Sequence, residues 1–103
     1  MRALLLLALL ACAAPLVAAP RVVSLAPSLS EIVVELQADD LLVGVLDGGD
    51  RPPELAQLPS VGRYGQLDLE RLLSLKPDLI LLWPASVPPA QRAQLELLGI
   101  AMV

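Results

Sequence analysis

The sequence contains no histidine, and Cys12 is its only cysteine. Beyond Cys12 the chain therefore lacks the residues for a zinc site built from Cys and His, for a disulfide, or for a serine or cysteine nucleophile activated by His. The G-x-S-x-G, P-loop and G-x-G-x-x-G motifs are also absent. We expect neither an enzyme nor a resident metal or cofactor.

Basic side chains are scarce as well. Seven Lys and Arg stand against eleven Asp and Glu, which gives a formal net charge of −4, and removal of residues 1–18 with Arg2 would make it −5. Nucleic-acid-binding proteins neutralise phosphates with clustered Lys and Arg, and the sequence has neither such a cluster nor an RNA-binding aromatic motif. With 103 residues, we expect one small acidic domain that does not bind nucleic acid.

The first 18 residues have the composition of a secretory leader. Arg2 gives a positive start, residues 3–11 are apolar, and small residues follow. A membrane-spanning helix needs about 20 apolar residues, and Pro15 interrupts this shorter run. We predict a signal peptide over 1–18. Cys12 also fits a lipoprotein signal in which this cysteine is lipidated, but the apolar segment after it lacks the polar, flexible character of a tether.

Apolar runs that predict strands alternate with helical patterns from Arg21 onward. The runs are nearly free of polar residues, as in strands buried on both faces of a parallel sheet, and cover 21–25, 42–46, 61, 79–83 and 100–103. Helices are predicted over 28–40, 54–58, 68–75 and 91–98. This alternation predicts an α/β fold, a parallel βαβ sheet with helices on its faces. Ligands bind such sheets at the carboxyl ends of the strands, followed here by the loops 26–27, 47–53, 62–66 and 84–89.

Two helix starts carry specific signals. Ser28 and Glu31 have the spacing of a capping box, and Asp68 is a good cap for the helix that follows it. The first helix should turn one apolar face inward, formed by Leu29, Ile32, Val33 and Leu36.

The segment from Arg21 to Trp83 combines these features in a specific order. It reads RVVSLAPSLSEIVVELQADDLLVGVLDGGDRPPELAQLPSVG and continues into LDLERLLSLKPDLILLW. The order of strand, helix, strand, Pro-Pro loop and Lys-Pro-Asp turn resembles the first lobe of the periplasmic binding proteins that serve ABC importers, especially those that carry cobalamin (vitamin B12). The resemblance implies a monomeric periplasmic protein with two lobes and the ligand between them. Residues 19–103 would form a Rossmann-like N-terminal lobe, which we expect to be incomplete because the sequence stops within its last predicted strand.

Tyr64 and Trp83 are the only Tyr and Trp, and both are candidate ligand contacts. Trp83 ends an apolar run, and Tyr64 lies in a loop between two glycines, so either flat ring could stack on a planar or macrocyclic ligand. Their positions alone are equally compatible with structural roles, in which Trp83 packs in the core and Tyr64 packs on its own loop. The cobalamin-binding relatives carry an aromatic residue at both points, which implies stacking. Haem-binding relatives use a loop Tyr near this point as an iron ligand. Either Tyr64 or its neighbour Arg63 corresponds to that residue.

Gly48 and Asp50 lie in the loop after the second predicted strand, and the resemblance implies that this loop contacts the ligand. Cobalamin-binding relatives often carry an aromatic residue before the Asp and the Pro-Pro pair. Here Gly48 stands at that place, whereas Asp50 and Pro52-Pro53 remain. One expected wall of the site is therefore missing, which weakens the choice of cobalamin over haem or a ferric siderophore. Zinc- and manganese-binding relatives depend on His ligands, which this chain lacks.

Glu70 has two interpretations. Its carboxylate lies near a helix N-terminus, where it would be stabilised by about 0.3–1 kcal/mol. In the family that the chain resembles, an exposed Glu on each lobe pairs with arginines on the membrane subunit of the importer, and Glu70 in LDLERLLSLKPD matches that motif. We therefore expect permease docking through Glu70.

The function expected from the sequence is non-covalent capture of cobalamin for an ABC importer. Capture of haem or a ferric siderophore by a protein of the same superfamily is the first alternative. The second is a secreted α/β interaction domain without a small ligand, in which Trp83 should be buried.

Overall fold

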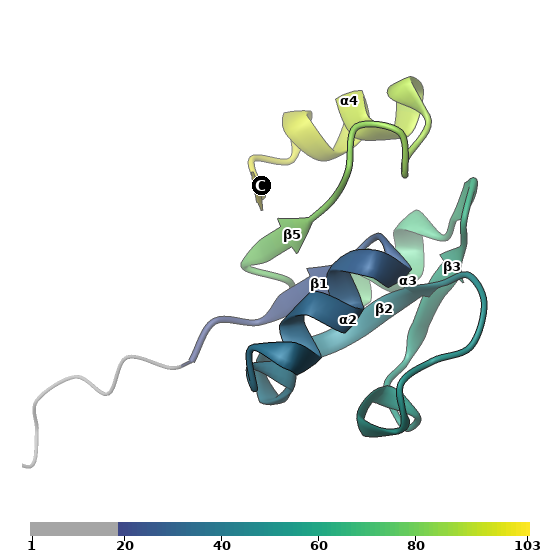
Figure 1. The fold of residues 1–103 in the computed structure, drawn as a ribbon. Coiled ribbons are helices and arrows are strands. Elements are labelled where there is room, and N and C mark those ends of the chain that lie inside the picture. Colours follow the sequence, from purple (N-terminus) through teal and green to yellow (C-terminus); the bar gives the residue numbers. More distant parts are fainter. Residues whose placement is uncertain (1–18) are drawn as a thin grey trace, which may run out of the picture.

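The computed structural model describes residues 19–103, which form one six-stranded sheet flanked by helices (Figure 1). The predicted signal peptide and Cys12 lie outside the described residues. The strands are β1 (Val22–Ser24), β2 (Leu42–Asp47), β3 (Ser60–Arg63), β4 (Gln66–Leu67), β5 (Leu79–Leu81) and β6 (Ala101–Met102). The helices are α2 (Pro27–Glu35), α3 (Leu69–Ser74) and α4 (Pro89–Leu97), with short 3-10 turns at η1 (Asp39–Leu41) and η2 (Pro53–Leu55).

The strand order is β4-β3-β2-β1-β5-β6, and every neighbouring pair is parallel except β3 and β4. The predicted α/β lobe with a parallel sheet is therefore confirmed. The antiparallel strand β4 was not predicted, because the sequence of residues 62–66 indicated a loop. Two glycines turn this segment into a hairpin, Gly62 with φ +118° and Gly65 with φ +83°, values that side chains other than glycine rarely adopt.

The sheet is covered on both faces, which accounts for its apolar strands. In Figure 1, α2 lies in front of β1 and β2, and α3 lies behind them. One core cluster joins alternate strand residues to α3 and α4, including Val23, Ile80, Leu72 and Leu95, each fully buried. The second lies on the side of α2 and η2 and includes Val22, Val45 and Leu55. The helix between β1 and β2 and the helix between β5 and β6 therefore cover opposite faces.

The predicted capping box at Ser28 is wrong. The helix begins one residue earlier, at Pro27, and its N-cap Ala26 makes no side-chain cap. Proline fits the first helical position because it has no N–H to satisfy there. The hydroxyl of Ser28 instead accepts a hydrogen bond from Trp83.

The inward face predicted for the first helix is also partly wrong. Gln37 adopts φ 58°, and the helix ends at Glu35, so Leu36 falls past its last turn and is 71% exposed. Ile32 is exposed as well, whereas Val33 and Val34 pack on the second core cluster.

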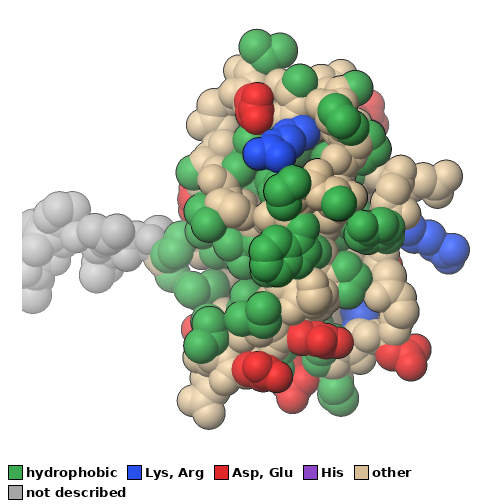
Figure 2. All heavy atoms as spheres, turned by 45° about the horizontal axis from the view of Figure 1, so that its top comes forward, with side chains coloured by type: hydrophobic (Ala, Val, Ile, Leu, Met, Phe, Trp, Pro, Cys, Tyr) green, Lys and Arg blue, Asp and Glu red, His purple; other side chains and the backbone are tan. Residues whose placement is uncertain are grey.

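Apolar side chains also reach the surface elsewhere. Figure 2 shows hydrophobic side chains across the middle of the face that it presents and acidic side chains grouped near its lower margin. Besides Ile32, Leu36 and the two aromatic residues, the large exposed hydrophobic side chains are those of Leu73, Leu97, Leu98 and Val103. Among residues 19–103, no helix has both the length and the apolar character needed to cross a membrane.

Candidate ligand-binding site

The carboxyl ends of β1, β2, β3 and β5 lie at one edge of the sheet, because these strands run parallel. The chain leaves β1 toward α2 on one face and leaves β5 toward α4 on the other. Adjacent strands whose connections diverge in this way open a crevice at their carboxyl ends, where α/β proteins bind ligands. The loops that follow β1 and β5 lie at this point of the sheet.

Trp83 follows β5 at this point of the sheet. The strand β5 ends at Leu81 rather than at Trp83 as predicted, so the tryptophan belongs to the loop that follows. Its indole Nε1 donates to Ser28 Oγ, in the first turn of α2, at 2.8 Å. Its backbone N–H donates to Ser86 Oγ, whose hydroxyl donates to the Trp83 carbonyl at 2.8 Å. Trp83 is 49% exposed, which contradicts a core position and leaves ring surface accessible.

We expect Ser28→Ala to release the indole edge without unfolding the lobe. Ser28 is exposed and makes no cap, so the main loss is one neutral hydrogen bond, about 1 kcal/mol or less. Because Trp83 is the only tryptophan, the emission maximum and anisotropy of the intrinsic fluorescence report on its ring alone. Both should change in Ser28→Ala and stay constant in Ser74→Ala, which removes a hydroxyl bonded within α3. An unchanged spectrum would mean that the bond to Ser28 does not orient the indole.

Tyr64 occupies the turn between β3 and β4 and is 58% exposed. Its backbone N–H donates to the Asp47 carbonyl at 2.9 Å, which ties the turn to the end of β2. Its hydroxyl donates to the Ala85 carbonyl at 3.3 Å, and Ala85 lies two residues after Trp83. The two aromatic residues are therefore connected through one loop.

A depression of ≈ 460 Å³ opens beside Tyr64, lined by Asp47, Gly48, Gly49, Arg63 and Tyr64. A Cβ atom on Gly48 would lie 3.0 Å from Pro27 Cγ and 3.6 Å from Tyr64 Cβ. Gly48 thus keeps the floor between Pro27 and the tyrosine open. The structure brings Gly48 and Tyr64 together, as expected for one site.

Asp50 is placed differently. It is exposed and lines a small cavity of ≈ 10 Å³ between the β2–η2 loop and the start of α2, together with Pro27, Arg51 and Leu55. A cavity of this size holds about one water molecule, so it offers no space for a large ligand. Asp50 is one residue removed from the wall formed by Gly48 and Gly49, and its contact with a ligand stays a prediction, as do those of Gly48, Tyr64 and Trp83.

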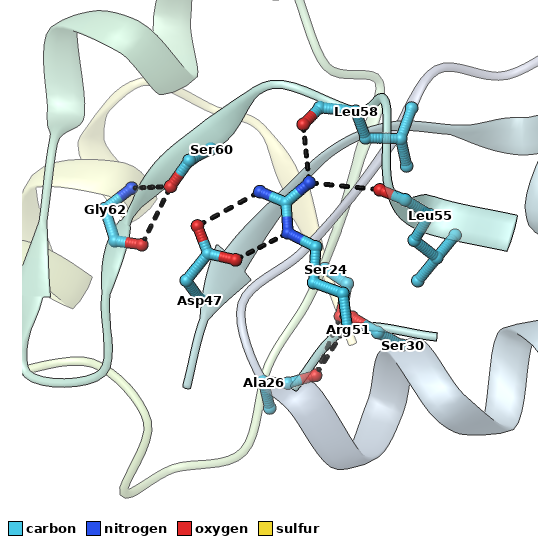
Figure 3. A network of polar contacts seen from close by, with 9 residues as sticks. All are labelled: Ser24, Ala26, Ser30, Asp47, Arg51, Leu55, Leu58, Ser60 and Gly62. Carbon is cyan, nitrogen blue, oxygen red and sulfur yellow. Dashed lines mark hydrogen bonds and ion pairs between the residues drawn. The ribbon is translucent and has the colours of Figure 1, made fainter. Parts of the chain in front are cut away.

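An ion pair between Asp47 and Arg51, which sequence reasoning missed, lies beneath this loop (Figure 3). The Arg51 guanidinium binds both carboxylate oxygens of Asp47, at 2.6 and 3.0 Å. These hydrogen bonds are the main reason why the pKa of Asp47 is lowered from its ordinary value of 3.8, although partial burial opposes the shift. The only available signal was a pair of opposite charges four residues apart in a loop.

This ion pair predicts a dependence of stability on pH. A carboxyl whose pKa is lower in the folded state contributes stability above its unfolded pKa of 3.8 and loses that contribution as the pH falls through the folded pKa. The urea midpoint of the parent should therefore fall more than that of Asp47→Asn when the pH is lowered from about 5 to about 3. Parallel curves for the two proteins would show that Asp47 does not contribute.

Glu70 lies in the first turn of α3, whose N-cap Asp68 accepts a hydrogen bond from the Arg71 N–H at 3.1 Å, as predicted. Its side chain is exposed, and it takes part in neither of the ion pairs found in residues 19–103. Within the same residues, no cluster of three or more acidic side chains could hold a metal ion. Glu70 is therefore available at the surface, and its docking role stays a prediction.

Residues 22–101 match the family model described as periplasmic binding protein. The chain is 40% identical over 84 residues to a vitamin B12-binding protein of Vibrio cholerae, which covers 82% of this chain and 30% of that protein. The crystal structure of the periplasmic vitamin B12-binding protein of Vibrio cholerae matches with a TM-score of 0.74 and 39% identity, over 82% of this chain and 33% of the other. A periplasmic heme-binding protein from Pseudomonas aeruginosa matches with a TM-score of 0.75 and 42% identity, over 82% and 30% of the two chains.

The chain thus spans about a third of the length of these relatives. The match runs from the first residue of β1 to the first residue of β6, and so covers the sheet except Met102 and all four loops at its carboxyl edge. The family model and these relatives are all described as binding proteins. The chain belongs to the periplasmic binding protein family.

Proposed function

We propose that this chain forms the first lobe of a periplasmic solute-binding protein that captures cobalamin and delivers it to an ABC importer. The observation that carries the proposal is the placement of the only two aromatic side chains. Tyr64 and Trp83 are about half exposed at the same edge of the sheet and are joined through Ala85. Accessible ring surface of this kind suits a large, flat macrocycle, since aromatic contacts add about 0.5–1.5 kcal/mol beyond the area that they bury.

The likeness to vitamin B12-binding proteins supports cobalamin as the ligand. The described residues offer one wall of a site, so a second lobe would complete it. Capture would be non-covalent, by a monomer, and a signal peptide over residues 1–18 would direct the protein to the periplasm.

Haem is the second candidate, and one observation favours it. The Tyr64 hydroxyl is bonded to the Ala85 carbonyl at 3.3 Å, longer than the 2.5–3.0 Å typical of O–H···O bonds. The bond would therefore be given up at little cost if the oxygen bound an iron atom. The likeness to heme-binding proteins at comparable identity supports this alternative.

Titration of Trp83 fluorescence separates these candidates. The full-length protein is titrated with cyanocobalamin, haemin and a ferric siderophore, and free tryptophan corrects for absorption by the ligands. Saturable quenching by cyanocobalamin alone, weakened in Tyr64→Ala, is the expected result. Quenching by haemin alone would reassign the site to haem, with Tyr64 as the first iron-ligand candidate, and the absence of saturation with all three would reject a site of this kind at Trp83.

Docking through Glu70 is tested separately from ligand capture. Glu70 lies on α3, whereas the two aromatic residues lie in the loops at the carboxyl edge, so Glu70→Ala should leave the affinity for cobalamin unchanged. Because a surface charge mainly affects encounter, we expect association with the importer to slow by about tenfold at low salt and less at high salt. Binding kinetics on importer-loaded nanodiscs measure this, with Glu96→Ala on α4 as the control. Equal rates for Glu70→Ala and the parent would contradict the docking role.

A further inference from the structure

Asp47 is connected to both Tyr64 and the two glycines that line the depression. Its carbonyl accepts the N–H of Tyr64 at 2.9 Å, which fixes the β3–β4 turn. The chain continues directly from it into Gly48 and Gly49, which line the same depression as Tyr64. The position of Asp47 therefore sets how far apart the tyrosine and the two glycines stand.

Arg51 in turn holds Asp47 and the loop behind it (Figure 3). Besides the two bonds to the carboxylate, its Nη1 donates to the carbonyls of Leu55 at 3.0 Å and Leu58 at 2.6 Å. One guanidinium thus closes the segment 48–59 onto the end of β2. That segment contains no regular structure apart from η2, so few backbone bonds of its own hold it in place.

We propose that Arg51 is a positioning residue for the ligand site: its bonds to Asp47, Leu55 and Leu58 keep Gly48, Gly49 and Tyr64 at the separation that the ligand requires. The role in binding rests on the function proposed above, whereas the effect on the loop does not. Arg51 itself lines the small cavity rather than the depression, so it acts through these neighbours and does not touch the ligand.

A purely stabilising role of Arg51 predicts faster amide exchange throughout the lobe, whereas a positioning role predicts faster exchange in the loop and the turn alone. The bonds of Arg51 join only Asp47 and the segment 48–59, and none of them reaches β1 or β5. Loss of Arg51 should therefore loosen the loop and the turn and leave the sheet centre intact. Local opening of this kind appears as faster amide exchange in one segment only.

Hydrogen exchange of the ligand-free, full-length protein tests the proposal with Arg51→Gln. The Tyr64 amide, bonded to Asp47, should exchange about tenfold faster than in the parent, while the Leu25 amide, bonded to the Leu81 carbonyl at 2.8 Å, should be unchanged. The matched control is Arg92→Gln, which removes the other arginine ion pair, to Glu96 on α4 at 3.5 Å, and should affect neither amide.

Calorimetric titration with cyanocobalamin supplies the second arm, with an expected loss of affinity of about tenfold in Arg51→Gln and none in Arg92→Gln. Equal acceleration at Tyr64 and Leu25, or none at Tyr64, would overturn the positioning role, as would full affinity despite a loosened turn. A parent that does not bind cyanocobalamin would overturn the proposed function instead, and the exchange arm would still decide whether Arg51 holds the turn. If Arg51→Gln does not fold, Arg51→Lys, which keeps the charge but loses the planar fork, is measured against the same outcomes.

Discussion

Replacement of Trp83 by alanine is expected to lower the affinity for cobalamin about thirtyfold, which corresponds to about 2 kcal/mol. The side chain is 49% exposed, so ring surface remains for a ligand to cover. Its loss removes both the apolar area and the stacking contribution. Because Trp83 is the only tryptophan of this sequence, the variant loses the fluorescence signal of this lobe, and the affinity is measured by calorimetry.

Leu97→Ala is the matched control for this experiment. Leu97 is 88% exposed and ends α4, which returns the chain to the start of β6 at the opposite edge of the sheet. Removal of this apolar side chain should not change the affinity. An affinity for Trp83→Ala within twofold or so of the control would place the ligand elsewhere, since a buried aromatic anchor contributes more than that.

Replacement of Gly62 by alanine is expected to destabilise the lobe by about 3 kcal/mol or more. A Cβ atom at this position would lie 2.2 Å from the Gln66 carbonyl oxygen and 3.0 Å from the Asp68 N atom. Both neighbours belong to the backbone and cannot turn aside as a flexible side chain would. The φ of +118° adds strain of its own. The hairpin must therefore rearrange, and the free energy of unfolding in urea should fall accordingly.

Gly65→Ala controls for the strain alone. Gly65 lies in the same hairpin with φ +83°, but no atom stands within 4 Å of a Cβ built on it. Gly65→Ala should lower the free energy of unfolding by about 1–2 kcal/mol, the penalty for a side chain in the left-handed region. Equal losses for the two variants would mean that the clash at Gly62 is relieved at no cost. Because Gly62 and Gly65 flank Arg63 and Tyr64, Gly62→Ala should also weaken ligand binding more than Gly65→Ala does.

The sheet was predictable because its signal is strong and local. Strands covered on both faces read as apolar runs, and each predicted strand is present in the structure. The cap at Asp68 was predictable for a related reason, since its side chain bonds to a residue three positions away. Ser28 showed a similar local pattern, but Pro27 preceded it and took the first helical position. The hydroxyl then bonded to Trp83, 55 residues away.

The site was only partly predictable, because the bonds that build it join residues far apart in the sequence. Tyr64 and Trp83 could be predicted as candidates because they are the only Tyr and the only Trp of the sequence. The structure places both at one edge of the sheet. The bonds that hold Tyr64 go to the backbone carbonyls of Asp47 and Ala85. Every residue has a carbonyl group, so no pattern of side chains indicates which one will accept. Arg51 was missed because two of its partners are carbonyls of this kind.

The contacts of Tyr64 and Trp83 with the loops also bear on how fast a ligand can be captured. The Trp83 ring already has its polar end bonded to Ser28 at 2.8 Å, whereas the bond of Tyr64 to Ala85 is long, at 3.3 Å. A side chain that must be immobilised on binding costs about 0.5–1.5 kcal/mol of conformational entropy, and for Trp83 the free lobe has largely lost that entropy in folding. A ring held in this way meets an arriving molecule in a single arrangement, so a productive encounter needs no rotamer search at Trp83. We therefore expect cobalamin to associate with this wall at a rate limited by diffusion and orientation rather than by rearrangement of the Trp83 ring.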